Sequence, residues 1–197
     1  MNNKELFIAE DEDIYSESFI NETINEQNII NKTIATTSFE KCNLSESDYN
    51  NVFFDKVIFI NCDLSNTKFT DCSFRETSFK NCKILGTSII NCHITKLNLE
   101  SSICKYLSII DTKTKELKVE NSDFTEATFY NVELSKTFFD NVNFNKSEFI
   151  QTPLFGIDFS SSNISGIKLS NDCLKGMKVN TIQAIELVRL LDIEVVE

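Results

Sequence analysis

The chain contains 197 residues, the length of a single domain, and its formal net charge of −11 argues against direct binding to nucleic acid. It has no recognisable leader segment and no apolar run of membrane-spanning length, so we expect a cytoplasmic protein that does not contact a membrane. Phosphate-binding, dinucleotide-binding, serine-hydrolase and zinc-site motifs are absent, and the single histidine, His93, has no nucleophile or second acid in register. We therefore expect no enzymatic activity, no bound metal and no cofactor.

The N-terminal part of the chain is strongly acidic. Residues 1–50 contain 11 acidic and 3 basic residues, and the densest cluster is Glu10-Asp11-Glu12-Asp13. We interpret residues 1–18 as an acidic segment that caps the domain. A solvated acidic tail that keeps the domain soluble is an equal alternative.

A five-residue period dominates the rest of the chain. From Ile14 to Val179 every fifth residue is apolar, and only Cys104 and Thr114 interrupt the series. Helices have a period of 3.6 residues and strands a period of two, so this spacing indicates a repeat architecture. Each residue of the series is called the central residue of its unit.

From Thr37 to Met177 most units have a small residue two positions before the central residue, and a turn residue lies two positions after it. The turn position is rich in Asn and contains all four glycines, which tolerate left-handed backbone. The small position holds five of the seven cysteines. This placement indicates a packing role rather than disulfide or zinc chemistry, for Cys42, Cys62, Cys72, Cys82 and Cys92.

These units resemble the pentapeptide-repeat family, as in Cys62-Asp63-Leu64-Ser65-Asn66 and Cys72-Ser73-Phe74-Arg75-Glu76. The resemblance covers residues 19–180 and implies an all-β fold, a right-handed quadrilateral β-helix of about eight coils. In such a fold, residues 20 apart stack in register. The period never shifts phase, so we expect no inserted loop. Long side chains occupy the small position in the first units, at Glu12, Glu17, Glu22, Gln27 and Lys32, so we expect the regular coils to begin between Phe19 and Ile34.

Two features of the repeats suggest a surface for a partner. Near the two interruptions, the small position is occupied by large residues: Leu97, Leu107 and Leu117. This pattern predicts a bulge over residues 102–118. A tolerated packing defect is the alternative. The bulge would expose Lys105, Tyr106, Lys113 and Lys115. Separately, an outward column at 20-residue spacing contains Ile90, Ile110, Tyr130 and Ile150. This column is either a partner surface or a ladder that stabilises stacking.

The repeat ends before residues 181–197, where Asn180 or Thr181 can cap a short helix that is followed by a short alternating strand. The helix is more apolar than one core-facing stripe requires. We therefore expect it to cover the open coil and to form a dimer interface, through Ile182, Ile185, Leu187, Val188, Leu190, Leu191, Ile193 and Val195.

This ending resembles the C-terminal module of the Qnr quinolone-resistance proteins, a subgroup of the same family. The matching residues are Gly176, Lys178, Val179, Gln183, Ala184, Leu187, Leu190, Leu191, Ile193 and Val195. The resemblance implies a tip-to-tip homodimer that mimics duplex DNA, binds DNA gyrase or topoisomerase IV and protects it from quinolones. The alternative is a repeat scaffold that binds another protein and has no topoisomerase role.

Overall fold

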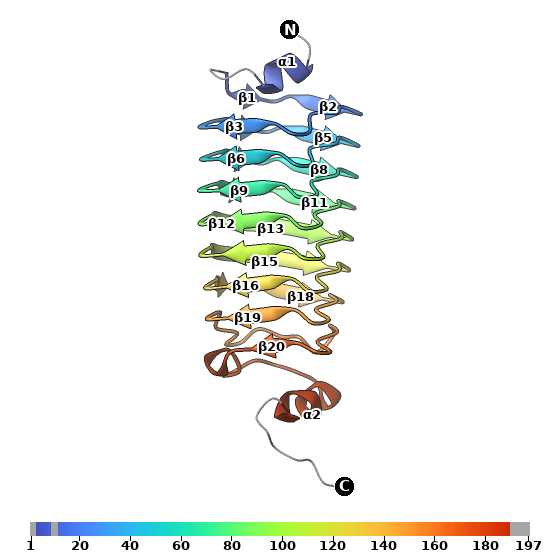
Figure 1. The fold of residues 1–197 in the computed structure, drawn as a ribbon, viewed down its shortest axis with the longest axis vertical. Helices are drawn as coiled ribbons and strands as arrows, with labels where there is room; N and C mark the ends of the chain where they lie inside the picture. Colours follow the sequence, from blue (N-terminus) through green and yellow to red (C-terminus); the bar gives the residue numbers. More distant parts are fainter. Residues whose placement is uncertain (1–2, 9–11, 190–197) are drawn as a thin grey trace.

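The computed structural model describes residues 3–8 and 12–189. These residues form a straight rod of stacked coils, with helix α1 (Asn3–Ile8) at one end and helix α2 (Thr181–Arg189) at the other (Figure 1). The structure is a parallel β-helix of about eight coils, as the sequence predicts. Each coil has four faces of one repeat unit each, and residues 20 apart pair in register, as in Phe54↔Phe74 and Ile89↔Ile109.

The four faces are numbered in chain order. Face 1 contains β1 (Ile14–Tyr15), β4 (Thr33–Ala35), β7 (Phe53–Asp55), β10 (Ser73–Arg75), the first halves of β13 (His93–Glu100) and β15 (Lys113–Glu120), and β17 (Glu133–Ser135). Face 2 contains β2 (Ser18–Ile20), β5 (Ser38–Glu40), β8 (Ile58–Ile60), β11 (Ser78–Lys80), the second halves of β13 and β15, and β18 (Phe138–Asp140). Face 3 is formed by single bridges from Thr23 to Asn163. Face 4 contains β3 (Asn28–Ile30), β6 (Asp48–Asn50), β9 (Lys68–Thr70), β12 (Ser88–Ile90), β14 (Ser108–Ile110), β16 (Thr128–Tyr130), β19 (Glu148–Ile150) and β20 (Lys168–Leu169). A 3₁₀ turn, η1 (Asn171–Cys173), follows β20.

The corners between the faces confirm the predicted turn position. From Ser16 to Gln151, the residue two positions after each central residue has a positive φ, near +50° to +60° for the non-glycine residues. Asn fills many of these corners, but Thr36 and Tyr106 adopt the same conformation. The left-handed region disfavours most side chains with a Cβ atom, so the stacking of neighbouring coils stabilises these corners.

The core consists of the central residues stacked along the rod axis. Phe19, Phe39, Phe59 and Phe79 form a continuous stack on face 2, with ring centroids 4.7–5.0 Å apart. The cysteines of the small position are buried beside these rings. The Cys42 thiol donates to the carbonyl oxygen of Phe19 at 3.4 Å, which confirms the packing role.

The predicted bulge over residues 102–118 is wrong. The register continues without interruption through Ile103, Ile109 and Leu117, and Cys104 and Thr114 are buried. The bulky residues of this stretch compensate for its small central residues: Leu107 and Leu117 fill space that phenylalanines occupy in other coils, and a cavity of about 50 Å³ remains between the two phenylalanine-rich segments. Burial also raises the pKa of the Cys104 thiol.

The coils begin earlier than expected. Ile14 already pairs with Ile34, five residues before the predicted boundary at residue 19. Long side chains fit at this end because helix α1, rather than a further coil, closes it. The buried Lys32 ammonium donates to the Phe7 carbonyl oxygen of α1 at 2.8 Å, and burial lowers its pKa. Phe7 itself covers the first coil, edge-on to Phe19 and Phe39, with ring centroids 5.7 and 5.8 Å away.

Candidate interaction surfaces

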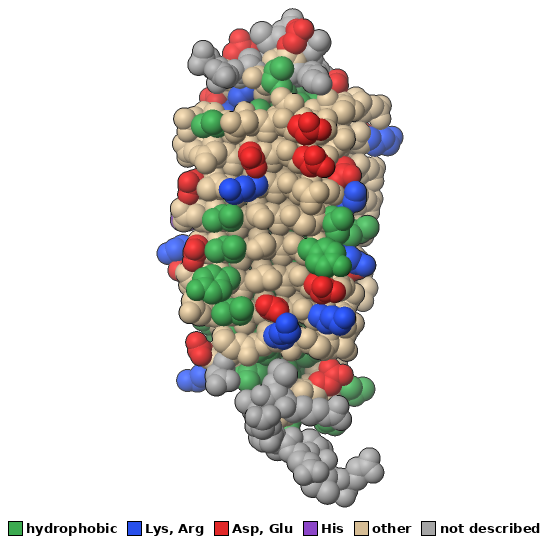
Figure 2. All heavy atoms as spheres, viewed as in Figure 1, with side chains coloured by type: hydrophobic (Ala, Val, Ile, Leu, Met, Phe, Trp, Pro, Cys, Tyr) green, Lys and Arg blue, Asp and Glu red, His purple; other side chains and the backbone are tan. Residues whose placement is uncertain are grey.

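Face 4 carries the predicted apolar column. The side chains of Ile90, Ile110, Tyr130 and Ile150 follow one another on paired strands of this face. The Tyr130 side chain is 39% exposed, and the isoleucines are half-buried. Figure 2 shows these hydrophobic side chains as a column over β12, β14, β16 and β19. The structure therefore brings the four residues together on one surface.

The four residues predicted at the bulge do not form one site. Tyr106 lies at a corner of face 4 and is 55% exposed. Lys105 precedes that corner on face 3, where its ammonium pairs with Asp123 at 3.3 Å. Lys113 and Lys115 lie on β15 of face 1, and Lys113 pairs with Glu133 at 3.0 Å. Only Tyr106 can act together with the apolar column.

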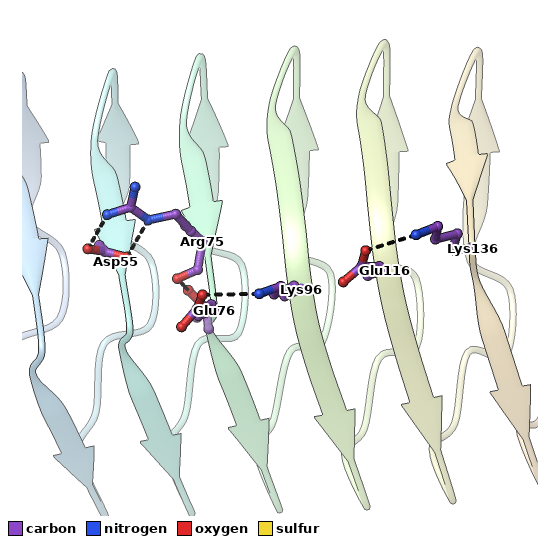
Figure 3. A network of polar contacts seen from close by, with 7 residues as sticks. Asp55, Arg75, Glu76, Lys96, Glu116 and Lys136 are labelled. Atoms are coloured by element: carbon purple, nitrogen blue, oxygen red, sulfur yellow. Dashed lines mark hydrogen bonds and ion pairs between the residues drawn. The ribbon is translucent and has the colours of Figure 1, made fainter.

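Ion pairs between successive coils line the corner that follows face 1. Lys96 pairs with Glu76 and Lys136 pairs with Glu116, each at 3.3 Å (Figure 3). On the face beside this corner, Arg75 makes two hydrogen bonds to the Asp55 carboxylate, which hold the pKa of Asp55 below its usual value. The charged residues along this corner alternate in sign, from Lys56 to Lys136, and have a net charge of +1, so the corner lacks the continuous negative charge of a DNA strand.

The acidic charge is concentrated in the first coils. Among the described residues, Glu17, Glu26, Glu46 and Asp48 are exposed and have no ion pair, whereas about half of the acids in the later coils pair with a Lys or Arg one coil away. The end of the rod that carries α1 is therefore the acidic end.

The opposite end is closed by α2, and its Gln183 side chain bonds to the last coil. The amide of this buried residue donates to the carbonyl oxygens of Phe159 at 2.9 Å and Ser162 at 2.7 Å. Its side-chain oxygen accepts from the Asn180 N–H at 2.9 Å, while the Asn180 side-chain oxygen accepts from the Gln183 N–H at 3.0 Å. This reciprocal pair is a capping box that starts the helix at the predicted position.

The apolar residues of α2 divide into two groups. Ile182 and Ile185 are 74% and 41% exposed. Leu187 is buried against the core of its own chain and Val188 is half-buried, and the place of both residues in a dimer interface stays a prediction. The remaining predicted interface residues lie outside the described residues, as does the predicted strand: Leu190, Leu191, Ile193 and Val195.

The described part of the chain contains no group of three or more residues with side chains that could jointly hold a metal ion. No helix within residues 3–8 and 12–189 has the length and apolar character needed to cross a membrane.

Two family models match the sequence. The model for pentapeptide repeat regions matches residues 52–123, and the model for pentapeptide repeats in eight copies matches residues 122–160, which together are more than half of the chain. The chain belongs to the pentapeptide-repeat proteins. No curated protein sequence matches this pentapeptide-repeat protein.

Solved structures are similar to this pentapeptide-repeat protein at low identity. QnrB1, described as a plasmid-mediated fluoroquinolone resistance protein, is 16% identical, with a TM-score of 0.40 over 92% of this chain and 100% of QnrB1. HetL of the cyanobacterium Nostoc, described as involved in the regulation of heterocyst differentiation, is 10% identical, with a TM-score of 0.36 over 84% of this chain and 86% of HetL. These likenesses concern the fold alone.

Two functional contacts were not predicted. Neither helix α1 nor the contact of Phe7 with the first coil was predicted from the sequence. The apolar run Leu6-Phe7-Ile8, just before the acidic cluster, could have indicated a segment that packs on the core. The bonds from Gln183 to the last coil were also missed. They depend on two backbone carbonyl groups, at positions 159 and 162, that no sequence pattern marks.

Proposed function

We propose that this protein is a non-enzymatic, DNA-mimicking rod that binds DNA gyrase or topoisomerase IV and protects it from quinolone-type inhibitors. The observation that carries the proposal is the C-terminal module. Its residue order resembles that of the Qnr proteins, from Gly176 and Lys178 through Gln183 and Ala184. Gln183, one of the residues of that resemblance, makes the contacts that close the last coil.

The active species in this proposal is a tip-to-tip homodimer. Ile182 and Ile185 present apolar surface at the end of the rod, beyond what the last coil of the same chain covers. Solenoids need covered ends, and an end that is still apolar after capping favours contact with another chain. Pairing at this end would place both acidic ends at the far tips of the dimer.

The charge distribution defines how the mimicry would work. Duplex DNA carries about one negative charge per 1.7 Å of its axis. Because the charges of this rod form ion pairs of alternating sign, its net negative charge per unit length is far lower. The proposed contact therefore depends on the rod shape together with the acids of the first coils, among them Glu26, Glu46 and Asp48. We expect its affinity to fall less steeply with salt than the affinity of gyrase for DNA.

A drug-protection assay tests the proposal. Gyrase supercoiling of relaxed plasmid is measured with ciprofloxacin, with and without the purified protein, and repeated with topoisomerase IV decatenation. The expected result is recovery of activity at micromolar protein. Ile182→Glu, which should prevent pairing, is the matched control and should protect less. No protection and no inhibition of either enzyme at micromolar dimer would refute the proposal.

A second candidate function is a scaffold that binds another protein through a side of the rod, without a topoisomerase role. The apolar column on face 4 favours it, because a DNA mimic has no use for an exposed Tyr130 beside a half-buried Ile110 in an uncharged setting. The two functions use different surfaces and can coexist in one chain.

A further inference from the structure

Face 4 is shaped as a shallow trough that runs along the rod. One wall is the apolar column from Ile90 to Ile150. The floor is the neighbouring outward column of the same strands, which consists of the short, half-buried side chains Ser88, Ser108 and Thr128. The opposite side is the corner that precedes these strands, where Tyr106 projects between Gly86 and Glu126. Figure 2 shows the floor as a tan band between the two sets of projecting side chains.

The dimensions of the trough match an α-helix. Its two sides, at Tyr106 and Ile110, are four residues apart along the chain, which corresponds to about 13 Å at about 3.3 Å per residue. A helix with its side chains is about 10–12 Å across. The apolar wall spans three steps between coils, about 14 Å at about 4.8 Å each, which is between two and three helical turns. Nearer the C-terminus a hollow of about 290 Å³ adjoins this surface, and it is lined by Thr128 and by four charged residues, Glu126, Lys146, Glu148 and Lys168.

The distribution of charge along face 4 favours one orientation of a bound partner. Beside the apolar wall, the Lys168 ammonium pairs with Glu148, so the charges there largely cancel. Towards the N-terminal end the same face, with its corner, carries exposed Glu26, Glu46 and Asp48 against a single cation, Lys68. A ligand that follows the trough therefore meets an apolar middle and a negative end.

We propose that this trough binds an amphipathic helix of a partner protein. The apolar side of that helix packs on Ile110 and Tyr130. Its N-terminal turn, with Lys or Arg side chains, points towards Glu46 and Asp48, where the positive end of the helix dipole is also favoured. This inference does not require topoisomerase binding: it shares Glu46 and Asp48 with the contact proposed above, but its apolar contact on Ile110 and Tyr130 takes no part in that contact.

A second copy of the chain fits the trough less well than a helix. Two rods aligned in parallel would set Glu46 and Asp48 against themselves. Two antiparallel rods centred on the apolar column would set Lys68 opposite Lys168. Either arrangement adds like-charge repulsion to a small apolar contact, whereas a helix with a basic start is complementary along the whole trough.

The test uses the full-length ¹⁵N-labelled protein and two synthetic peptides. The probe is a 15-residue amphipathic helix with Leu at i, i+4, i+7 and i+11 and Lys in its first turn. The control has the same composition in an order that gives no apolar face. We expect the probe to bind and to shift amide signals of β12, β14, β16 and the Tyr106 corner. The scrambled peptide should bind at least tenfold more weakly.

Two single variants locate the site. Tyr130→Thr should weaken probe binding at least fivefold. Ile58→Thr, which changes an isoleucine that is 44% exposed on face 2, should leave it unchanged, and circular dichroism verifies that both fold. Equal binding of the two peptides, signal shifts confined to other faces, or no binding at millimolar probe would overturn the proposal. So would self-association through face 4, detected as loss of those amide signals on concentration without peptide.

Discussion

One substitution can measure how much Gln183 stabilises the last coil. Gln183→Met keeps the length and most of the volume of the side chain but removes its donors and its acceptor. The Ser162 carbonyl oxygen then loses the Gln183 donor, the one hydrogen bond that the described residues provide to it. A buried carbonyl without a donor costs about 1–3 kcal/mol.

The other two bonds of Gln183 contribute less. The Phe159 carbonyl oxygen keeps the N–H of Ser162 at 2.8 Å, so its loss is an ordinary hydrogen bond of about 0.5–1.5 kcal/mol. Asn180 is exposed, and water can replace the acceptor for its N–H. We therefore expect Gln183→Met to lower the free energy of unfolding of the C-terminal coils by about 2–4 kcal/mol.

Hydrogen exchange measures where this loss occurs. Coils of a solenoid depend on their neighbours, so amide protection should fall in residues 152–179 and stay unchanged in the first coils. Gln183→Glu keeps the acceptor for Asn180 but sets a carboxylate against two carbonyl oxygens, so at neutral pH it should be worse than Met. Ile185→Ala on the same helix is the control. Unchanged exchange in Gln183→Met would refute the capping role.

Three further predictions concern a corner, a carboxylate and the dimer. Thr36 has a φ of +53° at an exposed corner, so Thr36→Asn should raise the free energy of unfolding in urea by about 1 kcal/mol; no gain would show that stacking removes the strain. Hydrogen bonds from Arg75 lower the pKa of Asp55, so their stabilisation is complete above the ordinary carboxyl pKa of about 3.9 and disappears as the pH falls through the lowered value. The stability difference between wild type and Asp55→Asn should therefore shrink in acid, and a constant difference would contradict this. Ile182→Glu should give a folded monomer by light scattering, whereas a persistent dimer would place the interface elsewhere.

The coil architecture could be predicted from the sequence because one period determines three things at once. A small residue, a central residue and a turn residue recur every five positions, and together they define which side chains point inward and where the chain bends. The interior of the irregular coils could not be predicted in the same way. Leu117 and Val119 are adjacent inward positions, and an excess of volume at one offsets a deficit at the other. When each position is considered alone, both residues resemble packing defects.

The ends of the rod were less predictable than its middle because no repeat constrains them. The capping helix α2 follows from Asn180 and the apolar run after it, but the burial of Leu187 depends on how the helix lies on the last coil. The apolar column on face 4 follows directly from 20-residue spacing. The position of Tyr106 opposite this column could not be predicted, because the sequence indicated a bulge where the structure has a regular coil.

The central proposal is that this rod occupies the DNA-binding surface of a type II topoisomerase, and a competition measurement tests it most directly. The protein is immobilised, gyrase is bound to it, and linear duplex DNA is titrated in at constant salt. The proposal predicts saturable gyrase binding that DNA displaces completely, and weaker binding by Ile182→Glu. Absence of gyrase binding, or simultaneous binding of DNA and protein to gyrase, would contradict it.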